Sequence, residues 1–349
     1  MRTVVGLPGT SDSRYVESLK AAGADEFFLG FVPAEWHRAY GFEVSPNRRY
    51  RRSQQVTDVG RLRELCEAAA PCPVAVTFNE HVLSRSAWRA TGGFPSVGGP
   101  GPAYRVLEDS LRSGVTGAIV AGPGVAALVH REFPDLALHM SGDGGVYNAA
   151  ACRFLAELGV GRVIFPRELP YPDLAASIAG ASDSMREFEA FVMGEPCVYD
   201  GARCFTEHGY AFPCDFCNHH SVRHVAERGR EGMRPLPSVG PGEALEAGEG
   251  NALRLGRCGL CAMPALAEAG ISHLKIPGRA SIALPALRLV KRMLEAMEAA
   301  ASADARELGL EPGSPLADDP LERVARRLLA APRLCSEGRF CYFPKQERT

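Results

Sequence analysis

The first half of the chain alternates short apolar runs with segments of helical spacing. The apolar runs occupy residues 3–9, 25–31, 72–81, 115–124, 136–145, 160–169 and 188–197. The helical segments lie between them, at residues 13–24, 59–70, 103–114, 124–134, 148–159 and 172–182. Nearly continuous apolar runs of strand length are typical of strands buried on both faces of a parallel sheet. The pattern therefore predicts repeated βα units.

An eighth candidate strand follows a long interruption, at residues 271–279. Eight βα units predict an α/β fold of the (β/α)8, TIM-barrel-like type. A doubly wound open sheet is the alternative, but no G-x-G-x-x-G run follows the first strand. Two further helices are predicted near residues 283–301 and 319–331, as a C-terminal helical extension.

Residues 198–256 separate the seventh and eighth strands and are rich in Cys, His, Gly and Pro. They predict a cysteine-rich insertion at the C-terminal end of a barrel strand, where barrel enzymes place their active sites. We therefore expect a barrel-like domain over residues 1–282 that carries this insertion. Residues 283–349 would form C-terminal helices and a cysteine-containing tail.

Composition and charge narrow the function classes. The chain has 349 residues, 46% of them hydrophobic, which is enough for a large core. Its net charge of −2 argues for a small-molecule substrate and against RNA, although residues 223–235 form one local basic stretch. No apolar run is long enough for a signal peptide or a membrane span, so we expect a cytoplasmic protein.

The eleven cysteines are unevenly distributed. Cys66, Cys72 and Cys152 lie in the first half, where small buried residues are expected. The other eight follow residue 196, and two C-x-x-C pairs among them suit metal or cluster binding. Spacing alone leaves zinc and iron–sulfur open. The eight are Cys197, Cys204, Cys214, Cys217, Cys258, Cys261, Cys335 and Cys341.

The segment FEAFVMGEPCVYDGARC resembles the signature of the collagenase-like peptidase family U32. That signature combines an acidic residue, an aromatic residue, a glycine and two cysteines, here Glu189, Phe191, Gly194, Cys197 and Cys204. Residues 138–169 and the strings VAGPGV, TFNEH and ALAEAGISHLKIPGR resemble further blocks of the family. The resemblance covers residues 3–282.

The resemblance implies a barrel-like fold and a [4Fe–4S] cluster held by the two signature cysteines and two later ones. The later two are a choice within each C-x-x-C pair. The predicted metal ligands are Cys197, Cys204, Cys214, Cys217, Cys258 and Cys261. Cys335 and Cys341 would allow a second cluster.

The resemblance also implies an activity, because the family includes iron–sulfur proteins that hydroxylate the ubiquinone precursor ring or RNA bases without oxygen gas. Prephenate is the oxygen donor for some of them. We therefore predict an oxygen-independent, iron–sulfur-dependent hydroxylase of a small aromatic substrate. The alternatives are a collagenase-like peptidase and a non-catalytic iron–sulfur subunit that pairs with a related protein in a hydroxylation complex.

Polar residues at the ends of the predicted strands are the candidate site. Two arginines suit a bidentate grip on a carboxylate, and the carboxylates suit acid–base work. The catalytic candidates are Asp143, Arg167 and Glu168, and the substrate-binding candidates are Asn79, Ser141, Asn148, Lys275 and Arg279. Local alternatives are a turn cap for Asn79, an Arg167–Glu168 salt bridge, a helix N-cap for Asn148 and a solvent-reaching Lys275.

Overall fold

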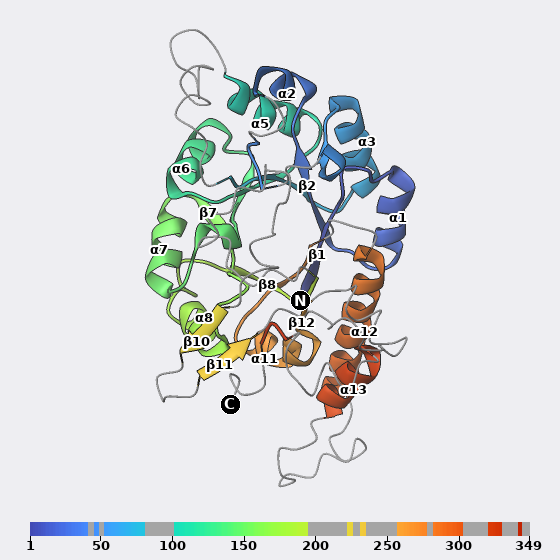
Figure 1. Cartoon of the computed structure of the whole chain (residues 1–349), viewed down its shortest axis with the longest axis vertical. Coiled ribbons are helices and arrows are strands. Elements are labelled where there is room, and N and C mark those ends of the chain that lie inside the picture. The colour runs from blue at the N-terminus through green and yellow to red at the C-terminus, as the bar shows by residue number, and fades with distance from the viewer. Residues whose placement is uncertain are drawn as a thin grey trace.

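The computed structural model describes residues 1–40, 45–48, 52–80, 101–194, 222–225, 231–234, 257–277, 282–302, 320–329 and 341–343. Eight parallel strands close into a barrel, because β1 pairs with both β2 and β13 (Figure 1). The strands are β1 (Arg2–Gly6), β2 (Glu26–Phe31), β4 (Val74–Phe78), β5 (Gly117–Val120), β6 (Ala137–Met140), β7 (Val160–Ile164), β8 (Glu187–Phe191) and β13 (His273–Ile276). The short strand β3 (Gln55–Val56) is added to β2.

Helices connect the strands and form a ring around the barrel (Figure 1). They are α1 (Ser13–Ala21), α2 (Ala34–Tyr40), α3 (Val59–Ala69), α5 (Pro102–Arg112), α6 (Pro123–Glu132), α7 (Ala149–Glu157), α8 (Tyr171–Ala179), α11 (Met263–Glu268) and α12 (Ala283–Ser302). Short 3-10 turns lie at η1 (Arg52–Gln54), η2 (Gly142–Gly144) and η4 (Leu260–Ala262). The predicted (β/α)8 architecture is confirmed.

Local sequence signals set where several helices begin. The side chains of Asp12, Asp58 and Asn148 accept backbone N–H groups in the first turns of α1, α3 and α7. Such N-caps satisfy donors that the helix itself leaves unpaired. Helices α5, α6 and α8 instead carry proline in the first turn, where a missing N–H costs nothing.

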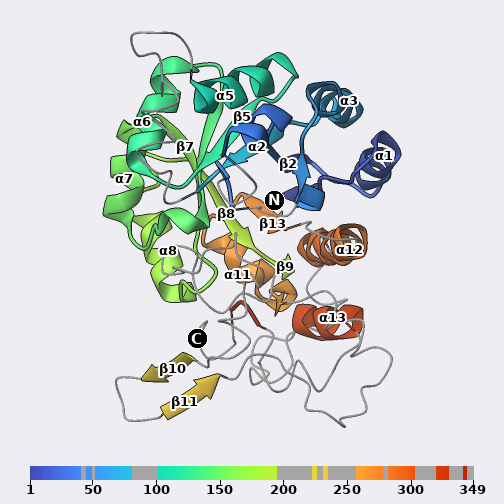
Figure 2. The ribbon, with the colours of Figure 1, turned by 45° about the horizontal axis from the view of Figure 1, so that its top comes forward.

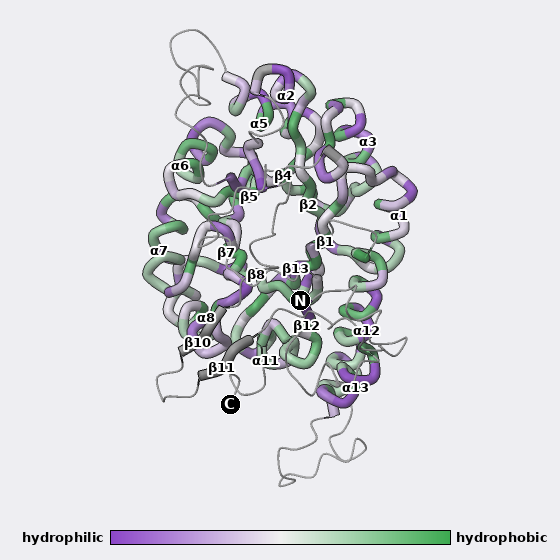
Figure 3. Tube along the Cα trace, viewed as in Figure 1, coloured by the Kyte–Doolittle hydropathy of each residue, from purple (hydrophilic) through white to green (hydrophobic). Residues whose placement is uncertain are grey.

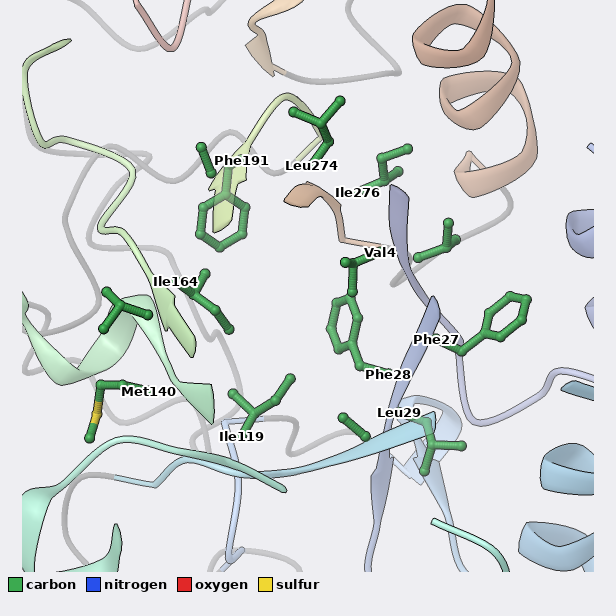
Figure 4. Packing of buried hydrophobic residues seen from close by; sticks show 14 of the residues in the cluster. Val4, Phe27, Phe28, Leu29, Ile119, Met140, Ile164, Phe191, Leu274 and Ile276 are labelled. Carbon is green, nitrogen blue, oxygen red and sulfur yellow. The ribbon is translucent and has the colours of Figure 1, made fainter. Parts of the chain in front are cut away.

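Apolar side chains fill the space between the strands and the surrounding helices. Neighbouring residues of one strand point to opposite sides, so Phe27 faces the helices while Phe28 faces the barrel interior (Figure 4). Ile119 and Phe191 also point inward (Figure 4). Hydrophobic and hydrophilic residues alternate along the tube of each helix (Figure 3). This is expected when one face of a helix packs on the strands.

The last helices extend the barrel on one side. Helix α12 contacts β1, β13 and α1, so it occupies the place of the eighth barrel helix. Helix α13 (Pro320–Leu329) lies outside α12 and contacts η4 (Figure 2). Both helices lie where the sequence predicted them. The division of the chain at residue 282 stays a prediction.

Two short antiparallel strands mark where the cysteine-rich insertion leaves and rejoins the barrel. Strand β9 (Met193–Gly194) follows β8 directly and pairs with β12 (Arg257–Cys258). Between them, β10 (Val222–Val225) and β11 (Glu231–Arg234) pair with each other. Among the described residues, no helix is long and apolar enough to cross a membrane.

Candidate active site at the barrel mouth

Three of the predicted site residues meet at the C-terminal end of the barrel. Asn79 follows β4, whereas Ser141 and Asp143 follow β6. The Asn79 Nδ2 donates to Asp143 Oδ2 at 2.7 Å and to Ser141 Oγ at 3.2 Å. The Ser141 hydroxyl also donates to Asp143 Oδ2 at 3.3 Å and accepts the Asp143 backbone N–H at 3.2 Å. The carboxylate of Asp143 is therefore held in a fixed orientation.

The second oxygen of this carboxylate remains available. Asp143 is half-buried, and both side-chain hydrogen bonds go to Oδ2. Within the described part of the chain, Oδ1 of Asp143 accepts no hydrogen bond. A preoriented carboxylate oxygen at the mouth of a barrel can accept a proton or a hydrogen bond from a substrate.

A buried polar group adjoins this cluster and was not predicted. The backbone N–H of Arg48 donates to Asn79 Oδ1 at 3.4 Å, and the Arg48 guanidinium lies 3.8 Å from Glu80. Asn47 and Gln55 exchange amide hydrogen bonds beside it, at 2.8 and 3.2 Å. The predicted pattern of strands and helices contains no signal for Arg48, because residues 45–48 belong to neither.

The side chains of the two candidates after β7, Arg167 and Glu168, contact different partners. The guanidinium carbon of Arg167 lies 4.2 Å from the centre of the Phe191 ring, a cation–π distance. Glu168 pairs with Arg257 at 2.5 Å rather than with its neighbour. The alternative of a local Arg167–Glu168 salt bridge is therefore wrong. Catalytic roles for both residues stay predictions.

Lys275 and Asn148 have clear structural partners. Lys275 is buried, donates to Glu189 Oε1 at 2.7 Å and lies 3.8 Å from the centre of the Phe28 ring. The alternative in which Lys275 reaches solvent is wrong. The Oδ1 of Asn148 accepts the backbone N–H of Ala151 at 2.9 Å, which confirms the helix N-cap. Substrate-binding roles for both residues stay predictions.

A network of buried charges lies inside the barrel, near the N-terminal ends of its strands. The sequence analysis did not predict it. The Arg162 guanidinium bonds Glu26 at 2.7 and 3.2 Å, Glu189 at 3.2 Å and Glu187 at 2.8 Å. The Nε2 of His273 lies 3.2 Å from Glu26 Oε1. The fully buried charges are thus paired, as their desolvation requires.

The network shifts the pKa values of its members. Burial raises the pKa of Glu26, but hydrogen bonds from His273 and Arg162 and the charge of Arg162 outweigh it and hold that pKa well below its usual range. Burial also raises the pKa of Glu189, but the charges of Lys275 and Arg162 outweigh it, so that pKa is lowered. Burial, helped by the charge of Arg162, lowers the pKa of His139 to about 3, so this imidazole is neutral at pH 7.

The described cysteines of the second half lie where the insertion rejoins the barrel. Cys258 pairs with Met193 across β12 and β9, and Cys261 lies one turn later in η4. Cys341 forms a β-bridge with Cys258. Among the described residues, no group of three or more His, Cys, Asp or Glu is arranged to hold a metal ion. The predicted ligands Cys197, Cys204, Cys214 and Cys217, together with Cys335 and Arg279, lie outside the described residues.

The mouth and the cysteine segment meet around Phe191. A side-chain carbon at Gly142, next to Asp143, would lie 3.4 Å from Cε2 of Phe191. On the other side, the rings of Phe191 and Tyr342 have centroids 6.3 Å apart. Tyr342 directly follows Cys341, and its backbone N–H donates to the carbonyl of Cys258 at 2.9 Å. Phe191 therefore lies between the backbone at Gly142, next to Asp143, and Tyr342, next to Cys341.

A family model and several known proteins match this chain. The model described as "Peptidase family U32" matches residues 101–342. The chain is similar to "tRNA hydroxylation protein P" of Escherichia coli, with 31% identity over 29% of this chain and 22% of that protein. It is also similar to the E. coli "23S rRNA 5-hydroxycytidine C2501 synthase", with 30% identity over 31% of this chain and 16% of that protein.

Two further matches complete the comparison. "tRNA hydroxylation protein P1" of Bacillus subtilis is 27% identical over 50% of this chain and 41% of that protein. The solved structure of the U32 peptidase Mk0906 aligns with a TM-score of 0.40 and 13% identity, over 55% of this chain and 69% of that chain. The matches thus span less than half the length of these three curated relatives.

The relatives overturn one prediction. We expected a small-molecule substrate and argued against RNA from the net charge of −2, whereas the relatives are named for tRNA and 23S rRNA. The net charge averages over the whole surface, and phosphate contacts need only a local group of basic side chains. Helix α13 carries three exposed arginines in two turns, Arg323, Arg326 and Arg327, of which Arg326 pairs with Glu322 at 2.6 Å.

Proposed function

The chain belongs to peptidase family U32, and we propose that it is an iron–sulfur-dependent hydroxylase that modifies a base in RNA. The proposal rests on the relatives named for hydroxylation of tRNA and 23S rRNA, because they share up to half of this chain. It also rests on the proximity of two chemically different groups around Phe191, an oriented carboxylate and a cysteine-bearing segment. That proximity is the observation that favours catalysis over a scaffold role.

The cysteines suit the proposed cluster. Thiolates are the ordinary ligands of [4Fe–4S] clusters, and the described Cys258 lies at the base of the insertion that contains the signature cysteines. Candidate ligands remain Cys197, Cys204, one of Cys214 and Cys217, and one of Cys258 and Cys261. If one iron of a bound cluster lacked a cysteine ligand, that iron would supply Lewis acidity toward a substrate oxygen.

The residues at the mouth would bind and orient the base. Asp143 Oδ1 accepts an N–H of the base or removes a proton, while Asn79 and Ser141 hold the carboxylate in place. The Arg167 guanidinium is half-buried and lies over the buried Phe191 ring, and a guanidinium plane of this kind can stack on a base. These contacts suit an unpaired nucleotide, whose base is free to enter the mouth.

We extend the proposal to the oxygen donor. Prephenate carries two carboxylates, and a guanidinium binds a carboxylate through two parallel hydrogen bonds. Arg167 is a candidate for one of them, and Arg279 is the candidate for the other. Activity measured with and without prephenate tests this part separately.

The test is in vitro hydroxylation by the full chain, purified and reconstituted without oxygen. tRNA and rRNA from cells that lack the gene are incubated with the protein, and digested nucleosides are analysed by mass spectrometry. We expect one nucleoside to gain one oxygen atom. If neither RNA yields such a product while the protein holds its cluster, the proposed function is wrong.

Variants connect the activity to the site. Asp143→Ala should reduce kcat/KM by about 10²–10⁴-fold, the usual contribution of an acid–base group. Asp135→Ala is the matched control, because Asp135 is exposed and precedes the same strand β6 at its opposite end. Equal activity of the two variants would contradict the role of Asp143.

A further inference from the structure

The tail residue Tyr342 is buried at the base of the cysteine-rich insertion. Its backbone N–H donates to the Cys258 carbonyl at 2.9 Å, and its hydroxyl donates to the carbonyl of Gly194. The guanidinium carbon of Arg257 lies 5.1 Å from the centre of its ring. Arg257 Nη2 also donates to the carbonyl of Cys341, the preceding residue, at 3.0 Å. These contacts fix the ring, although Tyr342 is 148 positions away from Gly194 along the chain.

On one side, the Tyr342 ring supports Phe191 and through it Arg167. The centroids of the two rings are 6.3 Å apart, and their planes are inclined by 33°. The Arg167 guanidinium in turn lies over the Phe191 ring. Phe191 and Tyr342 are buried whereas Arg167 is half-buried, so Arg167 is the one of these three that a substrate can reach. The place of this guanidinium therefore depends on a ring that Tyr342 supports.

A second route leads from Tyr342 to the residue after Arg167. Glu168 pairs with the buried guanidinium of Arg257 at 2.5 Å, and Arg257 lies over the Tyr342 ring. Two consecutive residues of the loop after β7 are thus tied to the same tail ring by different partners. The result is a closed set of contacting side chains, made of Arg167, Phe191, Tyr342, Arg257 and Glu168.

We propose that Tyr342 and Arg257 are positioning residues, which hold the Arg167 guanidinium at the mouth for stacking on the RNA base. The inference rests on the proposed function, because it takes Arg167 to be a residue that binds the base. An arginine side chain loses rotamer freedom when it binds, and one that is already held in place has less to lose. Its planar guanidinium also needs a defined orientation to stack. A tail residue would in this way contribute to substrate binding without touching the substrate.

The first test compares variants in the RNA hydroxylation assay, with the full chain reconstituted without oxygen. Tyr342→Leu should raise the KM for RNA by about 3–30-fold, the equivalent of one lost cation–π contact, with little change in kcat. Arg167→Ala should raise the KM similarly. The double variant should be no worse than Arg167→Ala, because Tyr342 acts through Arg167. Tyr342→Phe keeps the ring and should stay within about threefold of the wild-type KM.

The matched control is Tyr104→Leu, which removes another aromatic pair. Tyr104 contacts Phe133 at a centroid distance of 4.7 Å and belongs to helix α5, so its loss should leave the KM unchanged. Additive effects in the double variant, or an unchanged KM in Arg167→Ala, would overturn the inference. So would a Tyr342→Leu protein that loses iron or only kcat, because its effect would then lie at the metal centre. A wild-type protein that holds its cluster but yields no hydroxylated RNA would instead refute the proposed function.

A second measurement needs no activity. Residues 166–169 form the loop after β7, in which the Leu169 N–H donates to the Pro166 carbonyl at 3.2 Å. Hydrogen exchange of this loop, followed by mass spectrometry, should be about tenfold faster in Tyr342→Leu than in wild type, because the loop loses a support. Helix α1 should exchange equally in both proteins, and Tyr104→Leu should leave the loop unchanged. Equal protection of the loop in Tyr342→Leu and wild type would overturn the inference, whatever the activity of the protein.

Discussion

Replacing Arg162 by methionine tests the buried charges inside the barrel. Methionine keeps the apolar stem of the side chain but removes a guanidinium that bonds Glu26, Glu187 and Glu189. Arg162, Glu26 and Glu189 are almost completely buried, so water does not replace the bonds to these two glutamates, whereas the Glu187 side chain is 44% exposed. Removing one partner of a buried ion pair costs about 3–5 kcal/mol.

That free energy converts to a shift of the melting temperature. Unfolding entropy is about 2.1 cal/mol/K per residue, so a chain of 349 residues unfolds with about 0.7 kcal/mol/K. Arg162→Met should therefore lower Tm by about 4–7 °C, measured by circular dichroism at pH 7. The control is Arg131→Met, whose exposed pair with Glu132 should contribute about 0–1 kcal/mol. A Tm loss no larger than that of the control would refute the reasoning.

The same variant has a predicted pH dependence. The pKa values of Glu26 and Glu189 are lowered in the folded protein, so their contribution to stability is present above the unfolded value of about 4.3. This contribution is lost as the pH falls through the folded pKa. Without Arg162, the pKa values of Glu26 and Glu189 in the folded protein are lowered less. The Tm difference between wild type and Arg162→Met should therefore shrink below about pH 4.3. A difference that stays constant from pH 7 to pH 3 would contradict this cause.

Three further predictions concern other parts of the molecule. Asn148→Ala should cost about 1 kcal/mol because it removes the cap, whereas Asn148→Asp should keep both stability and activity; loss of activity in a stable Asn148→Asp protein would indicate substrate binding instead. Ellman's reagent at pH 8 should leave native Cys66 unmodified, because burial raises its pKa to about 12, and fast labelling of Cys66 relative to the denatured protein would contradict this. Arg327→Glu on exposed α13 should weaken RNA binding and lower the salt slope by about 1, and an unchanged slope in a filter-binding titration would exclude a phosphate contact there.

The barrel could be predicted because its strands are buried on both sides. Segments such as Phe27–Leu29 and Val74–Val76 are apolar at consecutive positions, which requires cover on both faces. Helices α2 and α11 were missed, since seven and six residues are too few for a clear helical period. The sequence also did not indicate that α12 completes the helix ring, because its apolar face fits a bundle equally well.

The candidate site could be predicted only in part. Asn79, Ser141 and Asp143 follow strands whose carboxyl ends meet at one edge, so position along the chain was sufficient to group them. The contact of Lys275 with Glu189 was not predictable, because the two residues are 86 positions apart along the chain. A signal existed, however: acidic and basic residues recur at alternate positions of several strands, as in Glu187 and Glu189. Charges with period two in buried strands indicate a charged barrel interior.

The spacing of the family signature follows from the geometry of strand β8. Glu189 and Phe191 are two residues apart, so both point inward, one toward Lys275 and the other toward the mouth. Gly194 then has a φ of +103°, and a side-chain carbon there would lie 3.2 Å from Cγ of Pro277. Only glycine adopts this conformation without strain. The strand therefore needs an acid to neutralise the interior, an aromatic ring to cover it, and a glycine to turn the chain into the cysteine-rich insertion.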